Sequence, residues 1–463
     1  MRHNRKAPGA RTHEGGPSVP IKETYLLRKL VATCLLWESK FYVDGFEVAD
    51  LIATVAASRP AEEVAALAVE ARTDMKLRHV PLWLAVGLAE QRKLKAQTLV
   101  DIIRRPDEMG EFLSLYWRNG RKPIAAQIKK GLARAFVKFD AYQLSKWTRE
   151  KDAIKPRDIM FLTHPKPVGG VKGYTKEARK RGERMTDDRD AGHYLFRQVA
   201  ERTLDPPDTW ETNLSAGKDK LGTWLRLIES RKLGLQATIM NLRNMKEAGV
   251  DKELVKLYLE EFPAQRIPVL PFRFIAAANA VPEWEDAIEP TMFRLVADLP
   301  KLPGKTAIVV DVSGSMFPGF FQPGLSGKST MAPVDNAAAL AILAREICEH
   351  SRVFCFANEC VEIAPRRGFA LRDAILRAPS GGTFLGRALE FVRRNLAPQV
   401  FDRVIVITDE QVHDSVGEVP GRRGYMINPV GYKRSVGFGK WTHIAGMSEK
   451  VLDFVREVEA LGG

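Results

Sequence analysis

The sequence is poor in the features that mark secreted and membrane proteins. Four cysteines in 463 residues are too few for a disulfide framework, and their spacing is not that of a zinc site. No apolar run reaches the length of a bilayer span, and the first residues lack the apolar core of a signal peptide. We therefore expect a cytoplasmic protein with reduced thiols and no membrane contact.

The signatures of enzymes are also missing. The sequence has no Walker-type phosphate loop, no Ser/His/Asp or Cys/His nucleophile set, and no group of clustered acids like that of a two-metal nuclease. We expect that the protein is not an enzyme. A single metal ion would leave only one catalytic alternative open, a metal-dependent cleavage of RNA.

Positive charge is in excess. Lys and Arg number 71 against 57 Asp and Glu, which gives a formal net charge of +14. A basic protein attracts polyanions, of which nucleic acid is the usual one. Residues 1–20 place Arg2, Arg5, Lys6 and Arg11 among Gly and Pro, which predicts a disordered basic tail.

Residues 21–295 follow a helical pattern. Leu82, Ala85, Val86 and Ala89, for example, recur at the spacing of one helix face. Short breaks with Pro or Gly, such as Arg59-Pro60, separate the helices. Many short helices in succession predict a stacked, HEAT-like repeat array, although no clean sequence period is present.

Residues 300–463 follow a different pattern. Apolar strands such as Thr306–Val312 and Val404–Thr408 alternate with helices such as Asp335–Glu349. This alternation predicts an α/β domain with a mostly parallel sheet. The stretch Leu299–Lys305, which contains two prolines and a glycine, is the expected boundary in a multi-domain chain.

One strand of this second domain ends in a motif rich in oxygen ligands. Asp311, Ser313 and Ser315 alternate directly after the buried run of residues 308–310. Ligands of open α/β sheets bind beyond the carboxyl ends of the strands, so the three side chains should share one loop at that edge. Carboxylate and hydroxyl oxygens suit Mg²⁺ or another divalent cation.

The Asp-x-Ser-x-Ser motif resembles the metal-ion-dependent adhesion site (MIDAS) of von Willebrand factor A domains. Two further ligands that this resemblance implies are present as Thr383, in a Gly-Gly-Thr loop, and Asp409, after a second buried strand. A hydroxyl-rich shell leaves the cation electrophilic, so we expect an acidic protein partner to supply a further ligand. The alternative is that these residues only form turns and helix caps.

The order of several segments resembles the TROVE family, which contains the Ro 60 kDa RNA-binding autoantigen and its bacterial or phage-type relatives. The resemblance implies a HEAT-like helical ring with a central hole, closed by a von Willebrand factor A domain with a Rossmann-like α/β fold. The segments that carry it are Gly131–Phe136, Phe139–Leu144, Arg157–Ile159, Leu162–Pro167, Asn241–Met245, Pro271–Phe274 and Asp311–Met316.

The resemblance also implies a function. It predicts a monomeric ribonucleoprotein component that binds small structured non-coding (Y-like) RNAs on an outer basic surface. Single-stranded 3′ ends of misfolded or unprocessed RNAs would thread the hole, in RNA quality control, maturation or turnover with a partner 3′ exoribonuclease. The competing hypothesis is a metal-dependent protein-interaction scaffold without an RNA function.

The RNA contacts implied by the family are a histidine and basic residues upstream of it. His164 matches that histidine, while the basic positions match only in approximate spacing. Four aromatic residues nearby, Tyr116, Trp117, Tyr142 and Trp147, either stack on bases or belong to the core. The predicted RNA-binding residues are Lys129, Lys130, Arg134, Lys138, Lys146, Arg149, Lys151, His164 and Lys166.

Overall fold

The protein is described from a computed structural model, which divides into two compact units. One unit comprises Ala49–Ala216, and the other comprises Met1–Val48 with Gly217–Gly463. In the described ranges no helix is long and apolar enough to cross a membrane. The structure describes residues 27–28, 30–31, 45–75, 77–120, 122–148, 152–167, 191–215, 219–262, 271–317, 331–395, 400–429, 441–445, 452, 455–456 and 458–459.

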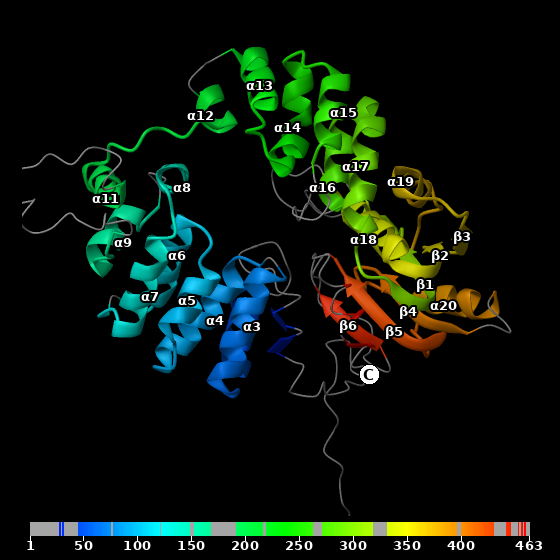
Figure 1. The fold of residues 1–463 in the computed structure, drawn as a ribbon. Coiled ribbons are helices and arrows are strands. Elements are labelled where there is room, and N and C mark those ends of the chain that lie inside the picture. Colours follow the sequence, from blue (N-terminus) through cyan, green and yellow to red (C-terminus); the bar gives the residue numbers. More distant parts are fainter. Residues whose placement is uncertain are drawn as a thin grey trace, which may run out of the picture. The chain divides into compact units, whose positions relative to one another are not determined.

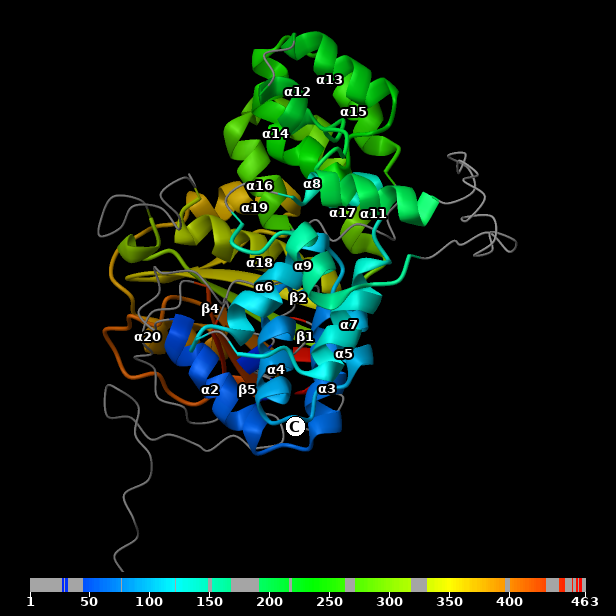
Figure 2. The ribbon, with the colours of Figure 1, turned by 90° about the vertical axis from the view of Figure 1, so that its left-hand side faces the viewer.

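The unit Ala49–Ala216 is built from short helices in two rows (Figure 2). Helices α3, α5, α7 and α9 contact one another in succession, while α4 and α6 lie behind them and α11 packs on α9. Successive helices of this unit therefore pack on one another along the chain. The helices are α2 (Gly45–Ala57, which begins before the unit), α3 (Ala61–Thr73), α4 (His79–Glu90), α5 (Ala96–Ile102), α6 (Pro106–Tyr116), α7 (Ala126–Phe136), α8 (Ala141–Lys146), α9 (Pro156–Thr163), α11 (Ala191–Glu201) and α12 (Trp210–Ser215).

The breaks visible in the sequence are where these helices begin. Pro106 and Pro156 occupy the first positions of α6 and α9, where a missing N–H leaves no hydrogen bond unmade. Asp140 caps α8 by accepting a hydrogen bond from the N–H of Gln143 at 2.7 Å, and the Gln143 side chain bonds back.

The other unit begins, in the described ranges after residue 217, with a second helical series. Helix α14 packs on α16, and α15 packs on α17. Both α16 and α17 contact the later helix α18 (Pro333–Ile347) of the same unit. Figure 1 shows these helices in green, leading to the strands of the same unit. They are α13 (Lys220–Glu229), α14 (Leu235–Glu247), α15 (Lys252–Glu260), α16 (Pro271–Ala280), η1 (Pro282–Trp284) and α17 (Glu285–Ala297).

A six-stranded sheet follows, with the strand order β3-β2-β1-β4-β5-β6 (Figure 1). All neighbouring strands are parallel except the edge strand β3, which runs antiparallel to β2. The order reverses at β1, so the carboxyl ends of β1 and β4 form the topological switch point of the sheet. The strands are β1 (Leu302–Asp311), β2 (Cys348–Phe356), β3 (Cys360–Ile363), β4 (Phe401–Ile407), β5 (Gly421–Asn428) and β6 (Trp441–Ala445).

Helices cover the sheet and join it to the helical series. Helix α18 (Pro333–Ile347) packs on β1 and β2, while α20 (Leu385–Arg394) packs on the face that carries Ala307 and Val309. Helix α19 (Gly368–Leu376) is tied to α17, because Glu289 accepts a hydrogen bond from the N–H of Phe369 at 2.7 Å. These contacts fix the helices 271–297 against the sheet domain.

The α/β pattern of the sequence corresponds to a mixed six-stranded sheet. The strands expected at Thr306–Val312, Arg352–Phe356, Val404–Thr408 and Tyr425–Pro429 coincide with β1, β2, β4 and β5. The short strands β3 and β6 and the helix α19 were not expected. Cys348, Cys355 and Cys360 are free thiols, as expected. The basic tail of residues 1–20 lies outside the described residues.

Candidate functional site: a buried acidic edge and a basic helical surface

The predicted metal ligands of the first loop come together at the carboxyl end of β1. Asp311 is fully buried, and one of its carboxylate oxygens accepts a hydrogen bond from the Ser313 N–H at 2.8 Å. Its other oxygen accepts a hydrogen bond from the hydroxyl of Thr408. The hydroxyl oxygens of Ser313 and Ser315 lie 3.2 Å apart. Three predicted ligands therefore share one turn.

The loop that carries Thr383 lies against this turn. The N–H of Gly314 donates to the carbonyl of Gly381 at 2.9 Å, which joins the two loops directly. Thr383 is 3 % exposed, and its backbone is held on both sides by His413. The Thr383 N–H donates to Nδ1 of that histidine at 3.1 Å, and the histidine N–H donates to the Thr383 carbonyl at 2.8 Å.

Asp409 completes the group just after the end of β4. One oxygen of its fully buried carboxylate accepts a hydrogen bond from the Gln411 N–H at 3.0 Å. The other, Oδ2, is buried without a hydrogen-bond partner among the described residues. Burial raises the pKa of Asp409, and a hydrogen bond from Ser315 partly offsets this effect. Burial and the nearby charge of Asp409 also raise the pKa of Asp311.

These residues fit a divalent cation. All the ligating atoms would be oxygens, and two of the groups are carboxylates that receive hydrogen bonds from hydroxyl and backbone N–H groups. One carboxylate oxygen has no hydrogen-bond partner among the described residues. No cluster of three or more His, Cys, Asp or Glu side chains with metal-binding geometry occurs in the described part of the chain. The predicted set has two carboxylates and three hydroxyls.

Thr408, which positions these loops, was not predicted from the sequence, whereas Glu410 is visible there as an extra acid directly after the predicted ligand Asp409. Thr408 bridges the site, because its hydroxyl donates to Asp311 and accepts from the N–H of Glu410 at 3.0 Å. Glu410 has a left-handed backbone (φ 62°) and is fully buried. Its carboxylate lies 3.1 Å from Nδ1 of His443 and 3.4 Å from the amide of Asn428. The extra acid thus has a network of its own.

Asp414 positions the helix that follows Thr383. Its carboxylate accepts hydrogen bonds from the N–H groups of Gly386 and Arg387, both at 2.9 Å, at the start of α20. It supplies from a distant loop the cap that α20 lacks in its own sequence. An acid 28 residues after its partner carries no local sequence signal, so this role needed the structure.

The predicted RNA-binding residues are spread over α7, α8 and α9 of the unit Ala49–Ala216. Lys130 and Arg134 lie on the exposed side of α7, and Lys129 is half-buried. His164 ends α9 in a left-handed conformation (φ 49°) with an exposed side chain, and its backbone N–H donates to Met160 at 2.9 Å. Lys166 is exposed. Because α7 contacts α9, these cations belong to neighbouring helices.

Other predicted cations contact groups of the protein itself or lie outside the described residues. The Lys138 ammonium donates to the carbonyls of Val100 and Ile103 at the end of α5, and burial lowers its pKa. Lys146 lies over the rings of Tyr142 and Trp147, at 5.7 and 5.8 Å from their centroids. Arg149 and Lys151 lie outside the described residues.

The four flanking aromatic residues differ in their burial and their contacts. Tyr116 is buried and its hydroxyl donates to Pro123, and the Trp117 indole donates to Lys122 at 2.7 Å. Trp147 lies under the guanidinium of Arg105, 3.5 Å from its ring centroid. Tyr142 alone of the four is largely exposed, at 47 %.

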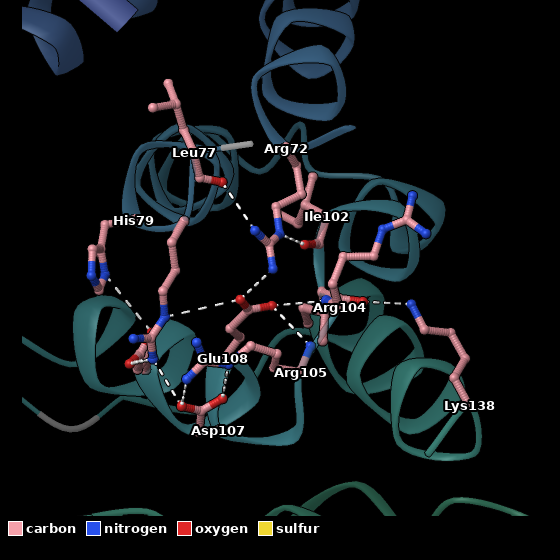
Figure 3. A network of polar contacts seen from close by, with 12 residues as sticks. Arg72, Leu77, His79, Ile102, Arg104, Arg105, Asp107, Glu108 and Lys138 are labelled. Atoms are coloured by element: carbon pink, nitrogen blue, oxygen red, sulfur yellow. Dashed lines mark hydrogen bonds and ion pairs between the residues drawn. The ribbon is translucent and has the colours of Figure 1, made fainter. Parts of the chain in front are cut away.

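A buried ion network occupies the interior near α7 (Figure 3). Glu108 is fully buried and accepts hydrogen bonds from Arg72 at 2.5 Å and from the N–H groups of Arg104 and Arg105 at 2.8 and 3.0 Å. Asp107 pairs with Arg78 at 2.8 Å and with Arg105 at 2.5 Å. The guanidinium groups of Arg72, Arg78 and Arg105 neutralise these buried acids, so these three arginines do not add to the basic surface.

Three comparisons with known proteins bear on this arrangement. The TROVE domain profile matches residues 202–297, which span α12 to α17. The mouse telomerase protein component 1 is 31 % identical over 83 residues, a stretch that covers 17 % of this chain and 3 % of that protein. The chain therefore spans only a small part of this relative.

A solved structure matches nearly the whole chain. The Ro (RSR) protein of Deinococcus radiodurans aligns with a TM-score of 0.59 and 16 % identity, over 92 % of this chain and 97 % of that chain. At this identity the match shows a common fold. Together, the profile match within the helical series and the similarity to the telomerase component confirm that the chain resembles the TROVE family.

Proposed function

We propose that the protein binds RNA through the exposed basic side of α7 and α9. The observation that carries this proposal is the placement of Lys130, Arg134 and His164 on two contacting helices with exposed side chains. Phosphate groups are bound by such cations, and their counterion release gives the affinity. The TROVE resemblance supports RNA as the polyanion.

The finer parts of the proposal come from the same resemblance. The helices close into a ring, the outer surface takes a small structured Y-like RNA, and the hole takes single-stranded 3′ ends of misfolded or precursor RNAs. A 3′ exoribonuclease performs the cleavage, while this protein, a cytoplasmic monomer without a catalytic site of its own, presents the RNA. The Y-like RNA and the nuclease in this proposal come from the family resemblance alone.

The acidic edge is proposed to hold Mg²⁺ or another divalent cation. Asp311, Ser313, Ser315, Thr383 and Asp409 would hold it, directly or through water. The cation would supply a Lewis-acidic position at the sheet edge for a carboxylate of a partner protein. The role of this site is therefore proposed to be adhesion, separate from the RNA surface.

The test is an electrophoretic mobility shift assay with one structured RNA, prepared with and without a single-stranded 3′ tail, at two salt concentrations. The proposal expects binding that weakens with salt and that is tighter for the tailed RNA. Equal binding of both RNAs would remove the threading of 3′ ends but keep the outer surface.

The second candidate function is a metal-dependent protein scaffold. The buried, unsatisfied oxygen of Asp409 favours it, because it points to a cation and a partner without any need for RNA. Failure of both RNAs to bind at low salt, together with Mg²⁺-dependent capture of an acidic protein ligand, would select this function instead.

A further inference from the structure

Three aromatic side chains in the unit Ala49–Ala216 are far more exposed than the others around them. Tyr142 on α8, Phe161 on α9 and Tyr194 on α11 have exposed fractions of 47, 49 and 51 %. Phe112 and Phe136 of the same unit are fully buried, so the core already has its aromatic side chains. Each exposed ring lies off the buried stripe of its helix and therefore adds little to the fold.

The helices that carry these rings are tied to one another. The Arg157 side chain at the start of α9 donates to the carbonyl of Ala200 in α11 at 2.9 Å. The hydroxyl of Ser145 in α8 donates to the carbonyl of Asp205, just after α11, at 2.6 Å. Helices α8, α9 and α11 therefore meet around the end of α11 (Figure 2).

Cations accompany two of the three rings, Tyr142 and Phe161. The Lys146 ammonium lies 5.7 Å from the ring centroid of Tyr142, and the Arg157 guanidinium lies 4.9 Å from that of Phe161. His164, one turn after Phe161, and Lys166 are exposed. A ring flanked by a cation offers one partner a flat apolar surface and a phosphate contact together.

The exposed apolar side chains of the second helical series are of another kind. On α13, α14 and α15 they are Leu221, Met240 and Leu257. Isolated aliphatic side chains at a surface are ordinary and select no particular partner. Planar rings with adjacent positive charge instead match the faces and phosphates of unpaired nucleotides, because paired bases in an RNA helix have no free faces.

We propose that Tyr142, Phe161 and Tyr194 form a stacking surface for the bases of single-stranded RNA, with Lys146, Arg157 and His164 beside its phosphates. This proposal rests on the RNA-binding function and deepens it. It adds a preference for unpaired nucleotides on this outer set of helices, independent of any threading through a hole.

The experiment replaces the three rings by leucine in the full-length protein (Tyr142→Leu, Phe161→Leu and Tyr194→Leu, singly and combined). Leucine keeps an apolar surface but cannot stack. The probes are a fluorescent 12-nucleotide oligouridine, a single strand carrying 2-aminopurine, and a 12-base-pair RNA duplex. We expect each ring to contribute roughly 5- to 100-fold in single-strand affinity, while duplex affinity stays within about twofold. The wild type should quench 2-aminopurine, and the triple variant should not.

Matched controls separate the stacking from other effects. Tyr142→Phe and Phe161→Tyr retain a ring and should bind like the wild type, and Leu257→Ala tests an exposed aliphatic position of the other unit. Unchanged single-strand affinity in the triple variant, or equal losses for strand and duplex, would overturn the stacking surface while leaving RNA binding intact. Lack of RNA binding by the wild type itself would instead defeat the proposed function. A protein partner docked on the rings would tolerate leucine and ignore the RNA probes.

Discussion

Two pairs of buried acids in this protein have opposite surroundings. Asp107 and Glu108, in the unit Ala49–Ala216, are surrounded by the guanidinium groups of Arg72, Arg78 and Arg105. Asp311 and Asp409, at the edge of the six-stranded sheet, receive their hydrogen bonds from hydroxyl and backbone N–H groups of the described residues. The first pair is neutralised by side chains of the protein itself, whereas the second is the pair that we propose to bind a divalent cation.

This difference distinguishes buried charges that are paired within the fold from buried charges that can still bind a ligand. A buried ion that is paired at both ends contributes to a single packing arrangement and has little left to offer a ligand. A buried acid without a counter-ion is costly to the folded state, and a bound cation removes that cost. The same distinction applies to cations, since Lys138 is held by a helix end while Arg134 lies exposed on the same face of the unit.

The largest predicted effect is in the neutralised pair. Glu108→Ala removes the acidic counter-ion of the buried Arg72 and the acceptor of two backbone N–H groups, so it should lower the free energy of unfolding by about 3–5 kcal/mol. Urea unfolding monitored by circular dichroism measures this. Glu63→Ala, which breaks a more exposed pair with Arg59, should change it by less than about 1 kcal/mol. Similar losses in both variants would contradict the structural role of the buried network.

The second prediction concerns the pair that lacks a cation. Mg²⁺ at about 100 times its dissociation constant should raise the free energy of unfolding of the wild type by about 2.7 kcal/mol, because only the folded state has the site. Asp311→Ala should remove this increase and the binding of an acidic protein partner, but leave RNA affinity unchanged. Thermal unfolding with Mg²⁺ or with EDTA measures the shift. A variant that still folds but loses RNA affinity as well would contradict the separation of the two sites.

The sequence predicts which residues meet at the acidic edge far better than it predicts which residues are exposed on the helical surface. Asp311, Ser313 and Ser315 lie within five residues at the end of a buried strand, and the parallel strand β4 brings Asp409 to the same edge, so the strand pattern is sufficient for these four. Thr383 lies in the loop between α19 and α20, which the hydrogen bond from the Gly314 N–H to the Gly381 carbonyl joins to this edge. Thr408, His413 and Asp414 act through tertiary hydrogen bonds, which no spacing in the sequence reveals.

On the helical surface, the sequence shows which residues are charged but not which groups their side chains contact. Lys138 and Arg134 are equivalent in a helical projection, and only the packing of α5 on α7 distinguishes the engaged lysine from the exposed arginine. Phe161 and Tyr194 were not predicted either, because an aromatic residue in an amphipathic helix is usually part of the core. Their exposure is a property of the assembled helices.

A third prediction tests how completely the arginine network neutralises its acids. Burial raises the pKa of Glu111, the outer acid of this network, to about 7, with Arg78 opposing. A folded-state pKa above the unfolded value means that the group stabilises the fold below about pH 4.5, and that this contribution is lost as the pH rises through 7. The free energy of unfolding of the wild type, relative to Glu111→Gln, should therefore fall between pH 4.5 and 7.

The neighbouring His79 gives the matched control. Burial lowers its pKa to about 4, so its contribution is complete above about pH 6.5 and is lost as the pH falls towards 4. Relative to His79→Gln, the wild type should therefore gain stability as the pH rises over that range. Parallel profiles for the two variants would show that both groups respond to a general change in net charge.

The smallest predicted effects concern two cations, Arg134 on α7 and Lys138 just after it. Arg134→Ala should reduce RNA affinity several-fold and lower the salt dependence of binding by less than about one unit, with stability unchanged within about 0.5 kcal/mol. Lys138→Met removes a cation from two carbonyls at the end of α5, so it should lower the free energy of unfolding by about 1 kcal/mol and alter RNA affinity less. Fluorescence anisotropy with labelled RNA and urea unfolding on the same two variants give both quantities. If Lys138→Met had the larger effect on RNA affinity, a lysine held at a helix end would also be an RNA contact, and the division between engaged and available charge would fail on this surface.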